Sequence, residues 1–556
     1  MTFWELFFRL LPHKPTSALA ACYWHLTRRR VRARNRLRAA SADLSFAYEI
    51  WIDRFERNAA REPQFRTLMN GWTEKPQFSI VLFGPGRAPA QLERSRQSIA
   101  RQIYPFCTLM GGSNTSPIAA ADGDYIVPLR AGDALSESAL FRFAEALQAE
   151  PKAAILYGDH DHSDQRGRRT RPWFKPDWNE ELFLAKDYLS GAMAIERTLA
   201  QRTAKELGSA ADELSVFTLA VTATGKPIVH VPHIVTHVHT SAENDDERSR
   251  MAAVAQQLMP FGGNCFPGPF GTIKVQWPLP TDLPLVSIIV PTRDKLELLR
   301  PCLKSVLGKT DYRNFEVLVI DNESAEQRTA DYLTEVARDP RVRVIRLAGA
   351  YNFSSFNNFA VGQVRGSYLC LLNNDTEVVE PAWLSEMVRY AVRPEAGAVG
   401  AKLLYDDGTI QHAGVVIGLG EAAGHAHRFL PADVPGYFCL PHVAHFASAV
   451  TAACLVVNKA KFEAVGGLDE SLAVAFNDVD LCLKLQAAGF RNVYVPHAVL
   501  LHHESKSRGN DMSPQHLERY RRELRLLQNR WGTKTYNDPL HNPNLDRYSE
   551  TYVVRI

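Results

Sequence analysis

The sequence has no apolar run long enough to cross a membrane. A transmembrane helix needs about 20 consecutive apolar residues, and the apolar stretches near the start of the chain are broken by charged residues and prolines. The arginines of TRRRVRARNRLR (27–38) follow these apolar stretches, which reverses the order found in a signal peptide. We therefore expect neither a membrane-spanning helix nor a cleavable leader.

Paired cysteines are also missing. The eight cysteines are scattered, and no two form a Cys-x-x-Cys motif, so the sequence predicts neither a zinc site nor a disulfide framework. Unpaired cysteines inside apolar runs are typical of buried thiols. A reducing cytoplasm is the simplest setting for such a chain.

The chain has little net charge, because 64 basic and 61 acidic residues nearly cancel. Outside 27–38 there is no basic stripe, which argues against a nucleic-acid partner. Residues 1–45 combine those arginines with six aromatic residues, and two interpretations stay open: a peripheral anchor on the inner face of an anionic membrane, or a solvated basic tail. The aromatic residues are Phe3, Trp4, Phe7, Phe8, Tyr23 and Trp24.

A chain of 556 residues is too long for one ordinary core, and its segments repeat. Three pairs resemble each other: 78–84 and 286–292, 123–133 and 366–376, 228–239 and 492–503. An internal duplication with alternating strands and helices predicts two tandem α/β domains, each with a mostly parallel sheet. The expected parts are the extension 1–45, a first domain 75–245, a Gly/Pro-rich linker 246–283, a second domain 284–510, and a C-terminal helix and tail 511–556.

In the second domain, acidic, amide and histidine residues follow apolar strands, where ligands bind in such sheets. Asp321 could bind a nucleoside or form a turn. Asn373–Asn374–Asp375 could hold Mg²⁺ or Mn²⁺ against a diphosphate, or form a turn. Asn477–Asp480 could cap a helix or supply a general base. His502 or His503 could bind a metal or lie on the surface as satisfied polar groups.

Taken together and in this order, these residues resemble the donor and metal site of family 2 glycosyltransferases with the GT-A fold. The resemblance covers roughly 284–509 and includes VSIIVPTRD, VLVIDN, RGSYLCLLNNDTEV and VGGLDESLAVAFNDVDLCLKLQAAGF. The closing HHESKSRG is similar to that of rhamnosyltransferase-type members of O-antigen and related polysaccharide pathways.

This resemblance implies a role for each site residue. Thr292, Asp321, Asn373 and Asn374 would hold the nucleotide sugar. Asp375 would bind Mn²⁺ or Mg²⁺ together with a histidine, and His502 fits the spacing better than His503. Asp478 would be the catalytic base of a single, inverting displacement, with oxocarbenium character developing at the anomeric carbon.

Two positions depart from the family pattern. Asn373 replaces the first aspartate of the Asp-x-Asp motif, and Asn477 replaces the glutamate of the Glu-Asp pair. Asparagine can still hydrogen-bond a sugar but carries no charge, which would weaken metal binding. The implied donor is dTDP-rhamnose-like, with UDP-sugars next, and the implied acceptor is a growing polysaccharide or lipid-linked glycan.

The first domain lacks these groups at the aligned positions. Gly132 aligns with Asp375, Leu214 aligns with Asp478, and CTLMGGSNTSP (107–117) has no acid where Asp321 stands in the second copy. A one-residue slip would instead bring in Asp133 and Glu213. GDHDHSD (158–164) resembles a metal site, but we expect a polar loop at a strand end.

The first domain is thus expected to be a degenerate copy that is structural or binds acceptor glycan. A bifunctional enzyme with both domains active stays open, as does a non-catalytic glycan-binding scaffold. A nucleotidyltransferase would also use a metal-binding aspartate, but it would show a Gly-rich loop after the first strand. Here that loop is PTRDKLELL, without glycine.

Overall fold

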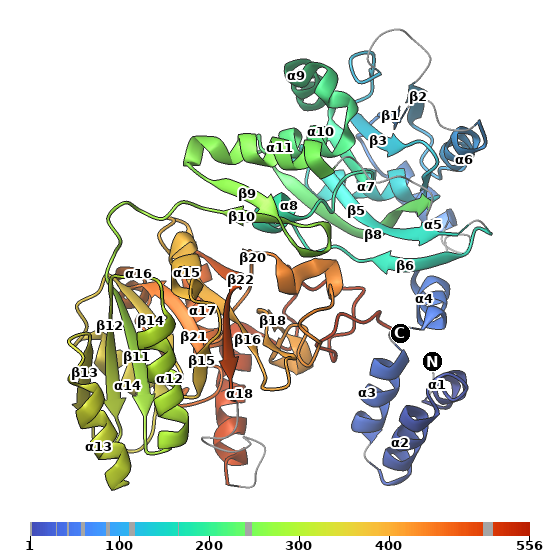
Figure 1. Ribbon diagram of the computed structural model, residues 1–556. Helices are drawn as coiled ribbons and strands as arrows, with labels where there is room; N and C mark the ends of the chain where they lie inside the picture. Colours follow the sequence, from blue (N-terminus) through green and yellow to red (C-terminus); the bar gives the residue numbers. More distant parts are fainter. Residues whose placement is uncertain are drawn as a thin grey trace.

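The computed structural model describes residues 3–28, 30–41, 44–56, 62–84, 89–110, 117–164, 166–239, 247–503 and 515–556. Within these ranges the chain forms an N-terminal helical unit, two α/β domains and a C-terminal tail (Figure 1). Figure 1 shows the first domain above the second, with the helical unit beside the second. No described helix is both long and apolar enough to cross a membrane.

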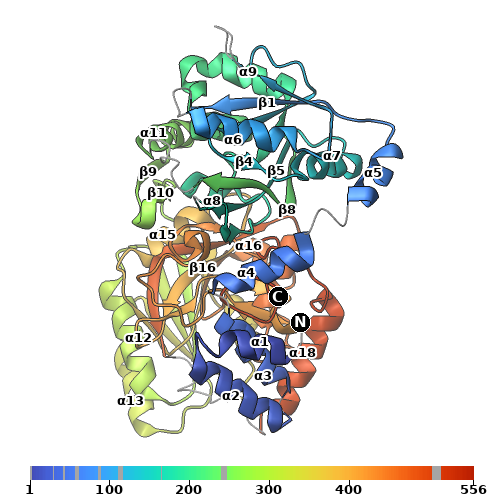
Figure 2. The same ribbon diagram turned by 90° about the vertical axis from the view of Figure 1, so that its right-hand side faces the viewer.

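The N-terminal helical unit consists of three helices: α1 (Phe3–Leu10), α2 (Pro15–Leu26) and α3 (Arg30–Ser41). They pack around a small apolar core to which Leu10, Ala18 and Leu37 contribute. Ile556 from the opposite end of the chain reaches the same core, and Figure 2 shows the two termini close together. Most of the 1–45 extension therefore folds as packed helices. α4 (Ser45–Trp51) leads from it to the first domain.

The first domain is built on a sheet with the strand order β2-β1-β3-β7-β5-β8-β4, and β6 pairs with β5 beside this path. Its strands are β1 (Phe78–Phe83), β2 (Cys107–Met110), β3 (Tyr125–Arg130), β4 (Ala134–Leu135), β5 (Ile155–Ser163), β6 (Arg169–Trp173), β7 (Met193–Glu196) and β8 (Ile228–His239). Its helices are α5 (Glu62–Asn70), α6 (Pro89–Ala100), α7 (Ala139–Ala149), α8 (Glu180–Ala185), α9 (Arg197–Leu207) and α10 (Leu214–Thr222).

The second domain has a larger sheet with the order β13-β12-β11-β14-β21-β16-β22-β15, to which β17 and β20 add. Its strands are β11 (Val286–Thr292), β12 (Phe315–Asp321), β13 (Val342–Arg346), β14 (Tyr368–Leu372), β15 (Thr376–Val378), β16 (Ala396–Leu404), β17 (Ile410–His412), β20 (His445–Phe446), β21 (Cys454–Asn458) and β22 (Arg491–His502), with β18 (Val415–Ile417) and β19 (Ala423–His425) forming a separate ribbon.

Helices cover both faces of this sheet, so its central strands are buried throughout. Every residue of β11 and β12 is buried, which explains their continuous Val/Ile-rich sequences. The helices are α12 (Leu296–Lys309), α13 (Gln327–Val336), α14 (Phe353–Val361), α15 (Trp383–Ala391), α16 (Lys459–Ala464), α17 (Asn477–Ala487) and α18 (Leu517–Trp531).

The two sheets share one topology. The path β2-β1-β3-β7-β5-β8-β4 corresponds strand for strand to β12-β11-β14-β21-β16-β22-β15. The first three strands of each path are parallel. The remaining pairs are antiparallel except for β5–β8 and β16–β22, which are parallel, so both sheets are mixed. Two tandem α/β domains are therefore present, as the sequence repeats predict.

A repeated glycine explains part of the sequence match. The backbone N–H of Gly123 donates to Ser79 Oγ, and that of Gly366 donates to Ser287 Oγ, each at 2.9 Å. A Cβ atom at either glycine would lie only 2.8 and 2.9 Å from the backbone nitrogen of that serine. Both motifs thus need glycine because the neighbouring strand approaches closely.

The predicted linker 246–283 is largely structured, which corrects that expectation. It contains α11 (Glu247–Leu258) and a hairpin of β9 (Asn264–Pro267) and β10 (Ile273–Gln276). The Gly/Pro-rich composition that predicts a loop belongs to the turn of this hairpin, where Gly271 has a φ of +66°. Ile273 and Val275 alternate inward from β10 and are buried in the core of the first domain.

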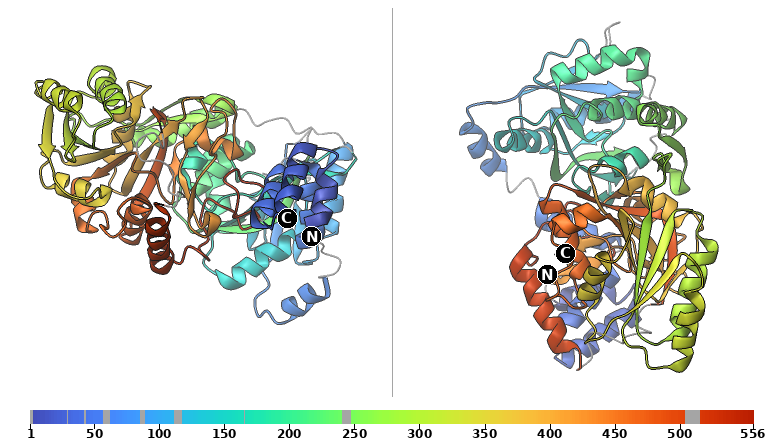
Figure 3. Two further views of the ribbon diagram at one scale, coloured as in Figure 1. Left: turned by 90° about the horizontal axis from the view of Figure 1, so that it is seen from below. Right: turned by 90° about the vertical axis from the view of Figure 1, so that its left-hand side faces the viewer.

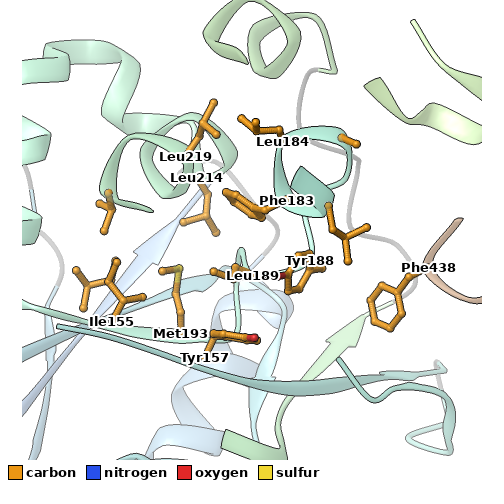
Figure 4. Close-up of a cluster of buried hydrophobic side chains, with 14 of the residues drawn as sticks. Ile155, Tyr157, Phe183, Leu184, Tyr188, Leu189, Met193, Leu214, Leu219 and Phe438 are labelled. Carbon is orange, nitrogen blue, oxygen red and sulfur yellow. The ribbon is translucent and has the colours of Figure 1, made fainter. Parts of the chain in front are cut away.

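The two domains are joined by an apolar core and by buried polar contacts. Phe438 belongs to the same cluster as Phe183 and Tyr188 of the first domain (Figure 4). Arg393 pairs with Glu181 across the interface. Figure 3 shows the helical unit and the α12–α13 side of the second domain at opposite ends of the molecule.

The C-terminal tail, defined as residues 532–556, connects both domains. Asn542 Nδ2 donates to the two carboxylate oxygens of Asp159 at 3.2 and 3.0 Å. Asp538 accepts a hydrogen bond from the Ile417 N–H at 2.6 Å. The preceding helix α18 is the C-terminal helix expected within 511–556, and it is followed by Gly532 in the left-handed region, a common way to end a helix. Residues 511–514 of the expected segment lie outside the described residues.

Candidate active site

A cavity of about 740 Å³ opens at the carboxyl ends of β11 and β14. This is the edge of an α/β sheet where ligands bind. Six of the seven residues predicted for the site line it, and they come from four separate elements or their adjoining turns: Thr292, Asn373, Asn374, Asp375, Asp478 and His502. Its volume falls within the range of small-molecule sites, about 300–1,000 Å³.

The turn after β14 places Asp375 at the cavity wall. Asp375 is buried, and its Oδ1 lies 3.3 Å from Nε2 of His502. Asn373 Nδ2 lies 3.3 Å from the same nitrogen, and Asn374 Nδ2 donates to Thr292 Oγ1 at 2.9 Å. The three consecutive residues thus connect the ends of β11, β14 and β22.

The two adjacent histidines have different surroundings. His502 is buried at the end of β22 and lines the cavity. The ring of His503 instead pairs with Asp406. Because the side chains of consecutive strand residues point to opposite faces, only one of the two can face Asp375. The structure places His502 there.

Asp478 and Asp480 also differ, although both lie in the first turn of α17. Asp478 lines the cavity, and its carboxylate accepts hydrogen bonds from the N–H groups of Ala452 (3.1 Å) and Val479 (2.8 Å). Burial raises the pKa of Asp478 above its ordinary value. Asp480 is fully buried and accepts hydrogen bonds from Arg530 and Trp531 of α18. Asp478 therefore faces the cavity, while Asp480 holds α18.

Asn477 lies beside Asp478 at the cavity and is buried. Its Nδ2 donates to the carbonyl oxygens of Leu472 and Val474 at 3.4 and 3.2 Å. Its amide thus fastens the loop before α17, and a carboxylate at this position could not donate these bonds.

Asp321 is the predicted residue that the structure does not bring to the cavity wall. It is buried at the end of β12, and its Oδ1 accepts a hydrogen bond from the Ser324 N–H at 3.0 Å. This is the turn-forming geometry that the sequence leaves open as the alternative. Asp294, two residues after Thr292, lines the cavity instead.

The loop after β11 brings cations that the sequence analysis did not assign. Arg293 and Lys295 line the cavity, as does Arg519 of α18. Asp294 and Lys295 have φ values of +51° and +56°, a region that costs non-glycine residues free energy. Asp294 Oδ1 holds this conformation by accepting hydrogen bonds from the N–H groups of Ala325 and Glu326, both at 2.8 Å.

A histidine pair lies in the same region. His425 lines the cavity, and its Nδ1 lies 3.0 Å from Nδ1 of His412. Burial lowers the pKa of His412 well below its ordinary value, so its ring is neutral. The N–H groups of Gly414 and Thr451 point at His412 Nε2 at 3.4 and 3.5 Å, so the ring proton lies on Nδ1 and is donated to His425.

The residues at the cavity can supply two ligands to a divalent cation, Asp375 and His502. Among the described ranges, no group of three His, Cys, Asp or Glu side chains is arranged to hold a metal. Mg²⁺ and Mn²⁺ need no such cage when substrate phosphates and water complete the coordination. The two side chains therefore fit a metal that binds together with a diphosphate, and Arg293, Lys295 and Arg519 add positive charge nearby.

At the equivalent positions the first domain has none of the proposed ligands. Ala134 pairs with His237 there as Glu377 pairs with Leu501 in the second domain, so the sequence alignment is in register at this edge. Gly132 thus corresponds to Asp375. Val238 corresponds to His502 in the same register. Leu214 aligns with Asp478 in sequence, but it is the first residue of α10 as Asn477 is the first of α17, so by helix start the equivalent of Asp478 is Ser215. The segment 111–116 lies outside the described residues.

The metal-like motif GDHDHSD is not the strand-end loop that we expect from the sequence. It lies almost entirely within β5 and buries Asp159 and Asp161. Asp161 accepts hydrogen bonds from Tyr48 (2.6 Å) and Arg169 (2.5 Å) and pairs with His237 (2.6 Å). Both aspartates are satisfied by hydrogen bonds to protein groups, which gives them a structural role.

Comparisons with known proteins show what the second domain is similar to. Residues 287–449 match the family model described as "Glycosyl transferase family 2". The chain is 42% identical over 464 residues to the uncharacterized protein y4gI of Sinorhizobium fredii, covering 80% of this chain and 51% of that protein. It is 36% identical over 442 residues to the O-antigen biosynthesis protein RfbC of Myxococcus xanthus, covering 77% and 34%.

A shorter match covers 11% of this chain. Over 62 residues it is 44% identical to an N-acetylglucosaminyl-diphospho-decaprenol L-rhamnosyltransferase of Mycobacterium tuberculosis, of which it covers 20%. The chain spans about half of the first relative and about a third of the second. Residues 287–449 of the second domain thus match the glycosyltransferase family 2 model, and the expected GT-A-like α/β fold agrees with this match.

Proposed function

We propose that the second domain is a metal-dependent, inverting glycosyltransferase. It would move a sugar from a nucleotide-sugar donor to a hydroxyl group of a growing surface polysaccharide or lipid-linked glycan. One observation carries the proposal: the carboxylates of Asp375 and Asp478 line one cavity, together with His502. This cavity can hold a donor between a metal ligand and a base.

In this proposal, Thr292 and Asn374 hold the nucleotide end of the donor at the end of β11. Asp375 and His502 would hold Mn²⁺ or Mg²⁺, which when bound neutralises the charge of the departing diphosphate. Arg293 and Lys295 would stabilise the same charge, because they line the cavity beside these groups. Asp321 is left with a positioning role, since it shapes the turn that contacts Asp294.

Asp478 is the proposed base. The acceptor oxygen attacks the anomeric carbon while the bond from that carbon to the diphosphate oxygen breaks, and the hydroxyl proton passes to Asp478. Two backbone N–H groups orient this carboxylate, and burial raises its pKa, which increases its affinity for that proton. A single displacement inverts the anomeric configuration.

The proposed donor and acceptor are supported by the similarity to relatives. The similarity to a protein named for O-antigen biosynthesis supports a polysaccharide acceptor, and the short match to a rhamnosyltransferase supports a dTDP-linked deoxysugar before a UDP-sugar. We place the reaction in the cytoplasm, on the inner face of the membrane, because lipid-linked acceptors are found at that surface.

The test is release of nucleoside diphosphate from a panel of dTDP- and UDP-sugars, with and without an acceptor glycan. We expect release to require acceptor and Mn²⁺ or Mg²⁺, to stop with EDTA, and to give a product of inverted configuration. Pyrophosphate release would instead indicate a nucleotidyltransferase. Glycan binding with no turnover for any donor would instead indicate a non-catalytic, glycan-binding scaffold.

A further inference from the structure

We propose that the N-terminal helical unit is a docking surface for an anionic lipid bilayer, on which it lies in the interface without spanning it. The inference concerns α1–α3 and does not depend on the chemistry proposed for the cavity. It rests on two apolar stripes that the protein leaves uncovered and on the charge of the same segment.

The helix α2 is apolar on two sides. Its residues 15–26 include no Asp, Glu, Lys or Arg. Ala18 and Ala21 pack into the core of the unit, while Leu19, Tyr23 and Leu26 are 58%, 63% and 69% exposed. The spacing of four and three residues places these three side chains on one face of the helix. A helix with apolar side chains on two faces needs an apolar partner for each of them.

The helix α1 presents a second stripe. It buries Leu6, Phe7 and Leu10 against the other helices, while Trp4 and Phe8, one turn apart, are 42% and 64% exposed. The stripes of α1 and α2 meet where the ring of Trp4 lies 5.5 Å from that of His25, next to Leu26. Aromatic side chains of this kind prefer the boundary between lipid and water.

The net charge of the helical unit differs from that of the rest of the chain. Residues 1–41 contain nine Lys or Arg residues and one acidic residue, a net charge of +8. The rest of the chain has 55 basic and 60 acidic residues, a net charge of −5. The chain therefore carries its whole positive excess in this unit. Arg28, Arg30, Arg34 and Arg36 are all exposed.

Apolar stripes beside exposed arginines fit an anionic bilayer better than the other cationic partners. A nucleic acid would bind the arginines but would gain little from Leu19, Leu26 and Phe8. Both features favour binding to a bilayer, because acyl chains cover the stripes and anionic headgroups attract the arginines. Figures 1 and 2 show the unit and α18, which contributes Arg519 to the cavity, both at the lower end of the molecule, and Figure 1 shows them apart from each other there. Docking would thus bring the second domain, beside which the unit lies, to the bilayer.

Sedimentation of the full chain with vesicles tests the proposal. We expect binding to vesicles of phosphatidylcholine with phosphatidylglycerol, weaker binding in high salt, and little binding to pure phosphatidylcholine. Replacing three exposed arginines with glutamine (Arg28, Arg30 and Arg36) should lower the partition coefficient about 100-fold, given the attraction of each basic residue to an anionic surface. The double variant Phe8→Glu with Leu26→Glu should lower it at least as much.

Matched controls separate the unit from general surface effects. Arg66→Gln, Arg202→Gln and Arg328→Gln remove the same charge at exposed sites elsewhere, and Met259→Glu with Phe261→Glu changes exposed apolar residues of the linker. Both controls should bind vesicles like the unchanged chain. Equal binding to both vesicle types, or full binding by the unit variants, would overturn the proposal, as would binding of the unit to nucleic acid but not to vesicles.

A further measurement separates this proposal from the enzymatic one. Release of nucleoside diphosphate in solution, with a soluble acceptor and no vesicles, should be unchanged in the unit variants. Loss of vesicle binding with intact release would support docking independently of catalysis. An inactive chain that still binds vesicles through these residues would refute only the proposed function.

Discussion

The two α/β domains have the same strand order and directions but differ in what they place at the ligand edge of the sheet. The second domain has Asp375, His502 and Asp478 around a cavity. The first has Gly132 and Val238 at two of the equivalent positions. One topology therefore carries these side chains around a cavity in one copy and lacks them at the equivalent positions in the other, and function resides in particular side chains on a fold.

The first domain uses charged residues to hold its own structure. Asp187 accepts hydrogen bonds from the Leu189 and Ser190 N–H groups at 3.0 and 3.1 Å. Burial would raise the pKa of Asp187, but Arg250 and Ser190 together hold it below its ordinary value. Lys175 is fully buried, and its Nζ has no hydrogen-bond partner among the described residues. The charges of Asp159 and Asp187 act on Lys175 inside the first domain, whereas Asp375 and Asp478 of the second domain line a cavity.

The substitution Asp478→Asn is expected to have the largest effect, and it tests whether the cavity of the second domain is an active site. The amide keeps the shape of the side chain but cannot accept the acceptor proton, so turnover should fall about 10²- to 10⁴-fold, while donor binding stays within a few-fold. Steady-state kinetics and donor titration measure both. Asp331→Asn, an exposed carboxamide substitution on α13, should change neither. Turnover above a tenth of normal in Asp478→Asn would remove this residue from the base role.

A matched pair of substitutions at equivalent strand positions comes next. His502→Ala should raise the Mn²⁺ concentration needed for half-maximal activity on the order of tenfold or more, because one of two protein ligands is lost. Val238→Ala should leave metal dependence and turnover unchanged. Metal titrations of activity compare the two. Selective loss of one product in Val238→Ala would instead indicate that both domains are active.

The pH dependence should follow Asp478. Burial raises its pKa in the folded enzyme, and a base must be ionised to act, so activity should fall as the pH drops through a value above the ordinary pKa of Asp. A kcat profile between about pH 4 and pH 8 measures this. The acid limb should be missing from the residual activity of Asp478→Asn. If the acid limb of the kcat profile were unchanged in that variant, the limb would report the ionisation of another group.

The smallest expected effect concerns Lys175 in the first domain. Burial lowers its pKa from 10.5 to about 7, so below pH 7 the folded state holds a buried charge. Between these two values the unfolded state binds more protons, and stability rises with pH. Lys175→Met should therefore raise the melting temperature most below pH 7, with a gain that shrinks toward pH 10.5. The exposed Lys205→Met should show no such trend; the same trend there would contradict the account.

Much of the fold can be predicted from the sequence because buried strands leave a strong local signal. β11 and β12 are continuous apolar runs, and Gly123 and Gly366 are fixed by the same close contact in both copies. The hairpin of β9 and β10 is not predicted, because each strand has only four residues and the turn between them is rich in Gly and Pro. In the sequence, Asp159 and Asp161 resemble loop residues. The residues that bury them are distant along the chain, so no local sequence pattern indicates their burial.

The cavity residues likewise divide into those that a local sequence motif predicts and those that it does not. Asn373, Asn374 and Asp375 are adjacent in sequence and follow a clear strand, so their motif locates the cavity edge. Arg519 lies on α18, more than 100 residues after the Asn373–Asp375 motif, and lines the same cavity. No local sequence pattern indicates that contact. The left-handed conformation of Lys295 depends on a hydrogen bond network around Asp294, which spacing alone cannot reveal.

The C-terminal tail imposes an order of assembly on the chain. Asn542 completes the hydrogen bonds of Asp159, 383 residues earlier in the sequence, and Ile556 packs against helices formed by the first 41 residues. The first domain is synthesised before the tail, so at that stage Asp159 holds its contacts to Lys175 and His230 but lacks those to Asn542. A chain that stops before Asn542 would lack this bond and would leave the helical unit without Ile556 in its core.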